Sequence, residues 1–455
     1  MKSAFTISEL YSRITVQYSA LTKNTISDTE QSNLQNMKVL LAAYICQPNL
    51  GSEHNLGWNW SLHLAEFGHE VWVLTYVDNQ PAIQQELAAQ PISNLQFIYI
   101  DDPSWIKICR RYFNSDTIWL IALRYLAWQK RAYNTGLQLD ENHAFDLVHH
   151  VTMSNLQTGS WLCHLNKPFI FGPVGGGQVA PSAFKKYFLK GWTYEVLRFF
   201  VLKHWGRFNP LISTTVSRTD LVLATNRDTA DLASNSGARR VELFLDSGLP
   251  QDYPLQEFFS RTTSQELRLL WLSRLEPRKG LLICLEALSK VNASVPFKLT
   301  IIGDGVLRHY LPEWIKEFGL ESKVEYLASV PWTEVKNKYL NSDVFLFTSL
   351  RDSFGSVILE AMSQALPVII FDHQGAGDFV PDGAGIKVPV TEPTDTVNAL
   401  AQAVEVMYRN PNKRLEMGRI AYDFAKTQTW AQKTLKMSRF YEEIVKAKQE
   451  QYSKI

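Results

Sequence analysis

Apolar runs and amphipathic segments alternate along most of the chain, and the alternation begins abruptly at Met37. Residues 38–45 form a continuous apolar run, which is typical of a parallel strand buried on both faces. Residues 55–67 have the spacing of an amphipathic helix that ends at Gly68, and residues 71–77 have the pattern of the next strand. This order predicts a βαβ unit with a right-handed connection in a parallel sheet.

The same alternation continues through both halves of the chain. Further strands are predicted at residues 145–151, 167–171, 220–225, 267–272, 297–302, 324–327, 344–348 and 367–371, with a short last strand that ends at Pro389. Further helices are predicted at residues 229–236, 281–289, 397–408 and 430–448. Strands that alternate with helices in this way indicate an α/β fold.

The length of the chain bears on its division into domains. A chain of 455 residues is too long for one hydrophobic core, so we expect two α/β domains. The predicted division is a polar extension at 1–36, a domain at 37–245, a weakly patterned linker at 246–266, a domain at 267–429 and a helix at 430–455. The extension lacks the apolar block of a signal peptide, and it is either a dispensable segment or a tail that folds onto the surface.

Composition excludes several classes of protein. The formal net charge is +1, which argues against a nucleic-acid-binding protein with a broadly basic surface. The four cysteines lie far apart and form no CxxC pair, which favours reduced thiols in the cytoplasm and argues against a structural zinc site. No apolar run is long enough to span a bilayer.

Two motifs in the second half predict a site for an anion with hydroxyl groups beside it. Arg274 and Lys279 follow the strand at 267–272, where open α/β sheets bind ligands, and these side chains grip phosphate well. Asp352 and Glu360 flank the start of a helix expected near Ser356, whose free N–H groups attract anions. Ionised carboxylates only accept hydrogen bonds, so they suit sugar hydroxyls rather than phosphate. The alternative is that these groups are surface charges and helix caps.

The first half has weaker candidates at the expected ends of its strands. Gly51 lies in the loop after the first strand, which lacks the GxGxxG fingerprint of dinucleotide-binding proteins. His149 and His150 end a strand, and the run Gly175, Gly176 and Gly177 places bare backbone at the end of another. A turn glycine, packing histidines and a flexible lid are the alternatives.

Two segments, at residues 105–133 and 184–208, are rich in both basic and aromatic residues. Amphipathic helices of this composition bind anionic membrane surfaces. The alternative is that the aromatic residues belong to the core and the cations to a solvated face.

The motif set resembles family-4 glycosyltransferases of the GT-B type. The resemblance rests on Arg274 and Lys279, on Gly303-Asp-Gly305, and on Asp352 to Glu360 followed by Ala361-Met362. The pieces Gly51-Ser-Glu53, Gly68-His-Glu70 and Gly172-Pro-Val-Gly-Gly-Gly177 are similar to a branch associated with bacterial surface polysaccharide synthesis.

The resemblance implies two Rossmann-like domains that face a central cleft, with the last helix crossing back to the first domain. It also implies a retaining enzyme that needs no metal or cofactor, uses a UDP- or GDP-linked sugar as donor, and acts on a glycan or lipid-linked acceptor at the inner face of the cell membrane. Residues are carried over in three groups: catalytic Arg274, Lys279, Asp352 and His150; donor-binding Gly51, Gly303, Gly305, Ser353, Phe354, Gly355 and Glu360; and acceptor-side Glu53, His149, Gly175, Gly176 and Gly177.

The sequence departs from the family pattern in two places. Asp352 stands where a glutamate is usual, one methylene shorter, and Gly172-Pro173 stands where many relatives have a histidine. His149 or His150 is then the candidate to replace that histidine. A nucleotide-sugar epimerase, a phosphorylase and a non-catalytic nucleotide- or glycan-binding protein are the rival functions.

Overall fold

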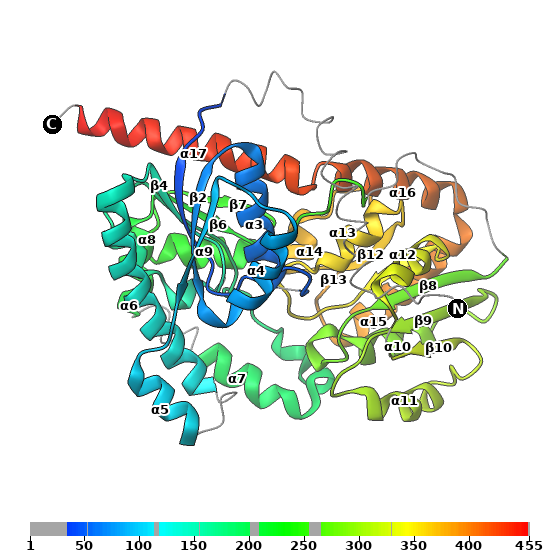
Figure 1. Ribbon diagram of the computed structural model, residues 1–455. Coiled ribbons are helices and arrows are strands. Elements are labelled where there is room, and N and C mark those ends of the chain that lie inside the picture. Colours follow the sequence, from blue (N-terminus) through cyan, green and yellow to red (C-terminus); the bar gives the residue numbers. More distant parts are fainter. Residues whose placement is uncertain are drawn as a thin grey trace, which may run out of the picture.

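Two parallel sheets, one in each half of the chain, organise the molecule (Figure 1). The computed structural model describes residues 34–453 except 52, 113–117, 154, 201–208, 254–264 and 329. The first sheet has the order β3-β2-β1-β4-β5-β6-β7 and the second β10-β9-β8-β11-β12-β13. The strands of the first sheet are β1 (Lys38–Ala42), β2 (Glu70–Tyr76), β3 (Leu95–Ile100), β4 (Leu147–His150), β5 (Phe169–Val174), β6 (Leu221–Ala224) and β7 (Val241–Leu243). Those of the second are β8 (Leu267–Leu272), β9 (Phe297–Ile302), β10 (Val324–Leu327), β11 (Val344–Phe347), β12 (Val368–Asp372) and β13 (Gly385–Pro389).

Helices cover both faces of each sheet. In the first half they are α3 (Glu53–Phe67), α4 (Gln80–Ala89), α5 (Ser104–Tyr112), α6 (Ile118–His143), α7 (Trp192–Phe200), α8 (Pro210–Arg218) and α9 (Arg227–Asn235). In the second half they are α10 (Leu281–Ser289), α11 (Leu311–Glu317), α12 (Trp332–Leu340), α13 (Ser356–Ser363), α14 (Gln374–Phe379), α15 (Pro393–Arg409), α16 (Pro411–Lys426) and α17 (Trp430–Tyr452).

The apolar run of β1 shows why these strands are central. Val39 and Leu41 pack into the cluster that contains α3 and α17, whereas Leu40 and Ala42 pack into the cluster on the other face. Successive strand residues point to opposite faces, so a strand covered on both sides must be apolar throughout. The structure therefore confirms the predicted α/β fold with two Rossmann-like, parallel-sheet domains.

The strand order places the candidate site. In each sheet the order reverses beside the first strand of the domain, between β1 and β4 and between β8 and β11. A crevice opens at such a reversal, beyond the carboxyl ends of the strands, and ligands bind there. The loops that follow β8 and β11 carry Lys279 and Asp352.

Two stretches of chain pass between the domains side by side. Leu249 accepts a hydrogen bond from the Trp430 N–H (2.9 Å) and donates its own N–H to Gln428 (3.0 Å). From Trp430 the chain continues as α17, which packs against α3 and crosses the N-terminal domain in red in Figure 1. Most of the predicted linker, residues 254–264, and residues 1–33 of the predicted extension lie outside the described residues.

One segment of the first half packs into the core of the second. The 3₁₀ helix η4 (Ser182–Gly191) buries Phe184, Tyr187 and Phe188 in the same hydrophobic cluster as β8, α10 and α15. Helix α7 follows directly. We call residues 182–200 the bridging segment, because it links the two domains at a second place.

Candidate active site

The loop after β8 is held against the end of β11 by Gly280. This residue has a φ of 70°, and a Cβ atom there would lie 1.9 Å from the carbonyl oxygen of Thr348. Only glycine tolerates both the left-handed backbone and this close approach. Thr348 completes the junction by donating its hydroxyl to the Gly280 carbonyl (2.9 Å). Lys279 and Asp352 are thereby brought together from the ends of two adjacent strands.

Lys279 and Asp352 form a buried ion pair at this junction. The Lys279 ammonium contacts Asp352 Oδ2 directly, and Arg278 Nη1 lies 3.6 Å from Asp352 Oδ1. Burial alone would raise the pKa of Asp352, but Lys279 and Arg278 outweigh it and hold that pKa below its usual value. Burial lowers the pKa of Lys279, although Asp352 opposes the shift. With Arg274, three cations (Arg274, Arg278 and Lys279) share two carboxylates (Glu276 and Asp352) around this junction, which leaves positive charge for a further anion.

Arg274 occupies a more open position. Its side chain is 67% exposed and pairs with Glu276 (2.7 Å). Arg278 pairs with the same carboxylate (2.8 Å). Arg274 is nevertheless close enough to Lys279 to contribute to the lowering of that residue's pKa. A ligand that reached this loop would meet Arg274 at its edge and Lys279 at its base.

Gly303 and Gly305 pack the next loop against the one that carries Arg274. Cβ atoms at these positions would lie 1.9 Å from the Ser273 carbonyl oxygen and 2.7 Å from that of Leu275. Both residues have φ angles in the left-handed range, 140° and 152°. Their close approach gives them a structural role in addition to the predicted donor contact, which stays a prediction.

Glu360 lies in the second turn of α13. Tyr339 donates its hydroxyl to Glu360 Oε2 (3.0 Å). Burial raises the pKa of Glu360 to about 7, against hydrogen bonds that lower it. When ionised, this carboxylate accepts hydrogen bonds from Tyr339 and Ser356 and still has lone pairs for hydrogen bonds from a ligand's hydroxyl groups.

Phe354 and Gly355 pack against the interior of the domain. The Phe354 side chain is buried and packs edge-on against Phe379 with ring centroids 6.0 Å apart. A Cβ at Gly355 would lie 2.6 Å from the ring of Phe347. The Phe354 ring therefore belongs to the core, so a donor contact by this residue would come from its backbone, and that contact stays a prediction.

Ser353 marks the place where the two domains meet. Gln178 donates to its hydroxyl across the boundary (3.2 Å), and a Cβ at Gly175 would lie 2.9 Å from the same oxygen. Gln374 makes a second link, accepting from the Asp352 N–H (2.9 Å) and donating to the Val179 carbonyl (2.8 Å). The Gly-rich loop of the N-terminal domain thus touches the carboxylate-bearing loop of the C-terminal domain.

The N–H groups of Gly176 and Gly177 have partners within the N-terminal domain. Gly176 donates to Gln178 Oε1 (2.8 Å) and Gly177 to the Thr229 hydroxyl (3.1 Å). A Cβ at Gly177 would lie 2.4 Å from the Asp228 carbonyl oxygen, so close packing accounts for this glycine. Of the three, Gly175 is the one at the domain boundary.

The two histidines do not line a cleft. His149 bonds to the Tyr441 hydroxyl and to the Gly172 carbonyl, each at 2.6 Å. His150 bonds to the Ser160 hydroxyl (2.8 Å) and to the Thr152 carbonyl (2.7 Å). Burial lowers the pKa of His149 to about 3 and that of His150 to about 4. The prediction of a catalytic His150, or of His149 facing the acceptor, is corrected here, because both rings are enclosed in the domain core.

Gly51 and Glu53 stand at the start of α3, after the first strand. Gly51 is exposed, and a Cβ there would meet no atom within 4 Å. Glu53 is the first residue of α3 and is partly buried. Their roles toward donor phosphates and acceptor stay predictions.

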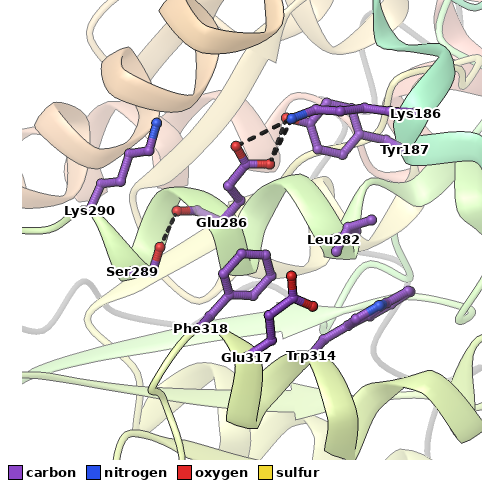
Figure 2. Close-up of a pocket in the computed structure, with 9 residues that line it drawn as sticks. All are labelled: Lys186, Tyr187, Leu282, Glu286, Ser289, Lys290, Trp314, Glu317 and Phe318. Atoms are coloured by element: carbon purple, nitrogen blue, oxygen red, sulfur yellow. Dashed lines mark hydrogen bonds and ion pairs between the residues drawn. The ribbon is translucent and has the colours of Figure 1, made fainter.

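A surface groove of about 490 Å³ lies away from this site (Figure 2). Lys186 and Tyr187 of η4 face Glu286 of α10 across it, and the Tyr187 hydroxyl donates to Glu286 (2.8 Å). None of the predicted site residues lines it. The groove is the place where the bridging segment docks on the C-terminal domain.

The sequence patterns did not identify three residues that support the site: Glu195, Arg351 and Gln374. Arg351 pairs with Glu195 of α7 (2.8 Å), and Gln374 joins the two domains as described above. Arg351 lies inside a motif that was singled out, but nothing in a single sequence pairs it with Glu195. Across the described ranges, no group of three or more His, Cys, Asp and Glu side chains is arranged to hold a metal ion.

Comparison with known proteins gives a family for the second half of the chain. Residues 254–424 match the family model "Glycosyl transferases group 1". The chain is 33% identical over 115 residues to an uncharacterized glycosyltransferase of Methanocaldococcus jannaschii, covering 25% of this chain and 30% of that protein. It is 29% identical over 168 residues to D-inositol 3-phosphate glycosyltransferase of Paenarthrobacter aurescens, covering 36% and 40%. The chain therefore spans less than half the length of these curated relatives.

A solved structure extends the likeness to both domains. The Anabaena protein Alr3699/HepE, in complex with UDP, is similar with a TM-score of 0.59 at 17% identity, over 89% of this chain and 99% of that chain. Identity at this level shows a shared fold.

Proposed function

Because residues 254–424 match the group 1 glycosyltransferase family model and the whole chain has the GT-B fold, we propose that this protein transfers a sugar from a nucleotide-sugar donor to an acceptor. The observation that carries the proposal is the junction of Lys279, Arg278 and Asp352 at the carboxyl ends of β8 and β11. This junction places positive charge beside a carboxylate at the edge of the sheet where open α/β sheets bind ligands.

The electrostatics of this junction suit departure of a nucleoside diphosphate. In glycosyl transfer, charge grows on the leaving phosphate oxygen while the sugar becomes cation-like. Lys279, with Arg274 at the edge, stabilises that developing charge more than the ground state, which is what accelerates the step. Because these side chains supply the neutralising charge, we propose that transfer needs no metal ion.

The donor is proposed to be a UDP- or GDP-linked sugar. Glu360 would accept hydrogen bonds from the ribose, and Asp352 would orient the transferred sugar. The complex of Alr3699/HepE with UDP supports a uridine nucleotide as the first to test. We further propose retention of the anomeric configuration by attack on the face from which the diphosphate leaves, with domain closure excluding water.

The acceptor is proposed to be a glycan or lipid-linked molecule of cell-surface polysaccharide synthesis, used at the cytoplasmic face of a membrane. Among the described helices, none has the length and apolar character to cross a bilayer. Helix α5, however, exposes Trp105, Ile108 and Tyr112 at the spacing of one helical face, beside the basic residues Lys107 and Arg111. This surface supports peripheral attachment to anionic lipid.

A donor screen followed by a transfer assay tests the proposal. Thermal shifts with a panel of UDP- and GDP-sugars identify the donor, since a ligand of the native state raises its stability. The labelled donor is then incubated with a lipid extract that contains acceptor glycolipids, and nucleotide release and labelled product are measured. We expect both to require the acceptor and to be lost in Lys279→Ala.

Each rival function gives a different result in the same assay. An epimerase changes the sugar without acceptor, and a phosphorylase requires inorganic phosphate. A non-catalytic binding protein shifts in stability but releases no nucleotide. Absence of a thermal shift with every nucleotide sugar would refute the proposal.

A further inference from the structure

Helix α7 has its charged side chains inside and its apolar side chains outside. Glu195 is 6% exposed and Arg198 is partly buried, whereas Leu197 is 62% exposed and Val196 48%. Surface helices of soluble proteins normally show the opposite arrangement, with an apolar stripe toward the core. This inversion indicates that the inner face of α7 has polar partners, whereas its outer face leaves apolar side chains exposed.

The inner face of α7 contacts the carboxylate-bearing loop. Glu195 Oε2 lies 2.8 Å from Arg351 Nε, and both side chains are largely buried. Arg351 directly precedes Asp352, and its carbonyl accepts from Arg278 Nη1 (3.2 Å). Removing one partner of a buried ion pair leaves an uncompensated charge, so Glu195 fixes the position of this loop.

The same face also contacts the Gly-rich loop. Arg198 Nη2 donates to the carbonyls of Gly176 (3.4 Å) and Gln178 (3.3 Å). Gln178 in turn donates to Ser353, which joins the two loops. Glu195 therefore contacts the loop on the C-terminal side of the domain boundary, and Arg198 contacts the loop on the N-terminal side. A shift of α7 would therefore move both loops of the proposed active site.

The segment that precedes α7 anchors it to the C-terminal domain. Phe184, Tyr187 and Phe188 are buried in the core of that domain, and Lys186 pairs with Glu286 (3.2 Å) as Figure 2 shows. The start of the bridging segment is thus fixed, and α7 extends from it beside the N-terminal domain (Figure 1).

The outer face of α7 fits an anionic lipid surface. Beside Val196 and Leu197 it exposes Tyr194, and the preceding helix η4 carries exposed Lys185 and Lys190. Apolar and tyrosine side chains flanked by lysines match a headgroup layer over acyl chains. In Figure 1, α5 with its own exposed apolar stripe lies along the same lower side of the molecule.

We propose that α7 couples docking on an anionic lipid surface to the organisation of the donor site. Insertion of Val196 and Leu197 holds the helix, and Glu195 and Arg198 then hold the carboxylate-bearing loop and the Gly-rich loop in register. The inference rests on the proposed function for its meaning, since a lipid-linked acceptor is met only at a membrane. The coupling predicts that the donor site becomes ordered when the protein binds the membrane that carries the acceptor.

Hydrogen–deuterium exchange of the full chain tests this coupling without any turnover. Exchange of backbone amides at 348–356 and 172–179 is compared with and without vesicles of phosphatidylethanolamine and phosphatidylglycerol, and vesicle binding is measured by flotation. We expect several-fold slower exchange in both loops of the unmodified protein on these vesicles, and no change with phosphatidylcholine alone.

Two sets of variants separate docking from coupling. Val196→Ser with Leu197→Ser should abolish the slowing and weaken flotation, to which the exposed face of α5 also contributes, whereas Val306→Ser, at an exposed valine elsewhere, should change neither. Glu195→Gln should float but show no slowing. Glu195→Gln combined with Arg351→Gln should do the same while leaving no unpaired buried charge, and thermal melts confirm that the variants fold.

Three outcomes would overturn the coupling: no flotation of the unmodified protein, flotation without slower exchange, or slowing that persists in both Glu195 variants. A dimer in solution that buries α7 and is lost with Leu197→Ser would show that a second copy covers this face instead. Because the measurement needs no donor, an absence of glycosyl transfer in the earlier assay would refute the proposed function and leave the coupling standing.

Discussion

At the scale of single residues, the chemistry of the site follows from an imbalance of charge. Lys279 and Arg278 both contact Asp352, while Arg274 approaches from the exposed edge with Glu276 as partner. A bound diphosphate would satisfy the excess cations, and its growing charge in the transition state would be met by groups already in place. Lys279 is buried and Arg274 is exposed, so their substitution should have different consequences.

Lys279→Ala and Arg274→Ala should each slow transfer on the order of a hundredfold or more, as loss of a preorganised electrostatic donor does. Lys279→Ala should also lower the free energy of unfolding, because it leaves Asp352 buried without its nearest cation. Arg274→Ala should leave stability almost unchanged, since exposed ion pairs contribute at most about 1 kcal/mol. Steady-state kinetics and chemical denaturation measure the two effects.

Controls distinguish chemistry from folding in these variants. Lys279→Ala with Asp352→Asn removes the unpaired charge and should recover stability but not rate. Arg409→Ala removes another exposed, ion-paired arginine, on α15, and should change neither. Normal rates in folded Lys279→Ala and Arg274→Ala proteins would show that these cations do not serve the reaction.

Glu360 should make the stability of the ligand-free protein depend on pH. Its pKa in the folded state is about 7, raised from 4.5, so the folded protein binds more protons than the unfolded chain between these values. The unfolding free energy from this group therefore falls as pH rises from about 4.5 to about 7, by at most roughly 3 kcal/mol.

Replacing this carboxyl should stabilise the protein and impair binding. Glu360→Gln should remove the slope, gain stability over the unmodified protein at about pH 8 but not at about pH 4.5, and weaken nucleotide-sugar affinity. Urea denaturation across pH and calorimetric titration measure this. Glu321→Gln, at an exposed glutamate, is the control. An unchanged pH profile in Glu360→Gln would show that this carboxyl does not carry the shift.

Residue patterns brought Lys279 and Asp352 together correctly, as the structure shows, but not the residues that support them. The spacing of Lys279, Asp352 and Glu360 after apolar strands placed them at one sheet edge, because parallel strands share that edge. The catalytic role predicted for His150 could not be judged from sequence, because a histidine at the end of a strand has the same local pattern whether it faces a cleft or the core. Its enclosure by Ser160 and Thr152 depends on long-range packing that no local pattern records.

At the scale of elements, buried strands were the most predictable part of the fold. β8, β9 and β10 have the predicted bounds, since a strand covered on both faces is apolar throughout. Helix α16 was missed, because many polar residues surround its few buried contacts. One of those contacts explains Gly418, where a Cβ would lie 2.5 Å from the Ala365 carbonyl oxygen.

Helix α17 should contribute to the stability of the N-terminal domain although it follows the C-terminal one. Tyr441 is fully buried and lies 2.6 Å from His149 Nδ1 through its hydroxyl. Tyr441→Phe should cost about 1–3 kcal/mol, because a buried polar atom loses its partner. Tyr441→Ala should cost about 3–5 kcal/mol, because it also leaves a cavity.

Chemical denaturation followed by tryptophan fluorescence measures these costs. Lys446→Ala, at an exposed position of the same helix, is the matched control and should change little. Equal stability of Tyr441→Ala and the unmodified protein would show that α17 is dispensable for the domain it crosses.

At the scale of the whole molecule, a few polar contacts join the two domains beside their crevice. Gln178 reaches Ser353, Gln374 reaches Val179, and Asp378 of α14 accepts from the backbone N–H of Arg227 at the start of α9 (2.7 Å). Each such hydrogen bond contributes only about 1 kcal/mol net. Their sum is small enough for a ligand to shift the balance between closed and open arrangements.

Asp378 is the most informative of these contacts to remove, because it pairs with the Arg227 guanidinium (3.2 Å) as well as with its N–H group at a helix start. Asp378→Ala should shift the ligand-free protein toward an open arrangement, with a larger radius of gyration in small-angle scattering, and saturating nucleotide sugar should restore the smaller value. Asp382→Ala, which removes a nearby and almost fully exposed acid paired with Lys387, should leave the radius unchanged. An unchanged radius in Asp378→Ala would mean that the bridging segment, rather than the contacts along the crevice, holds the domains together, and the loops of the donor site would then move as one body with α7.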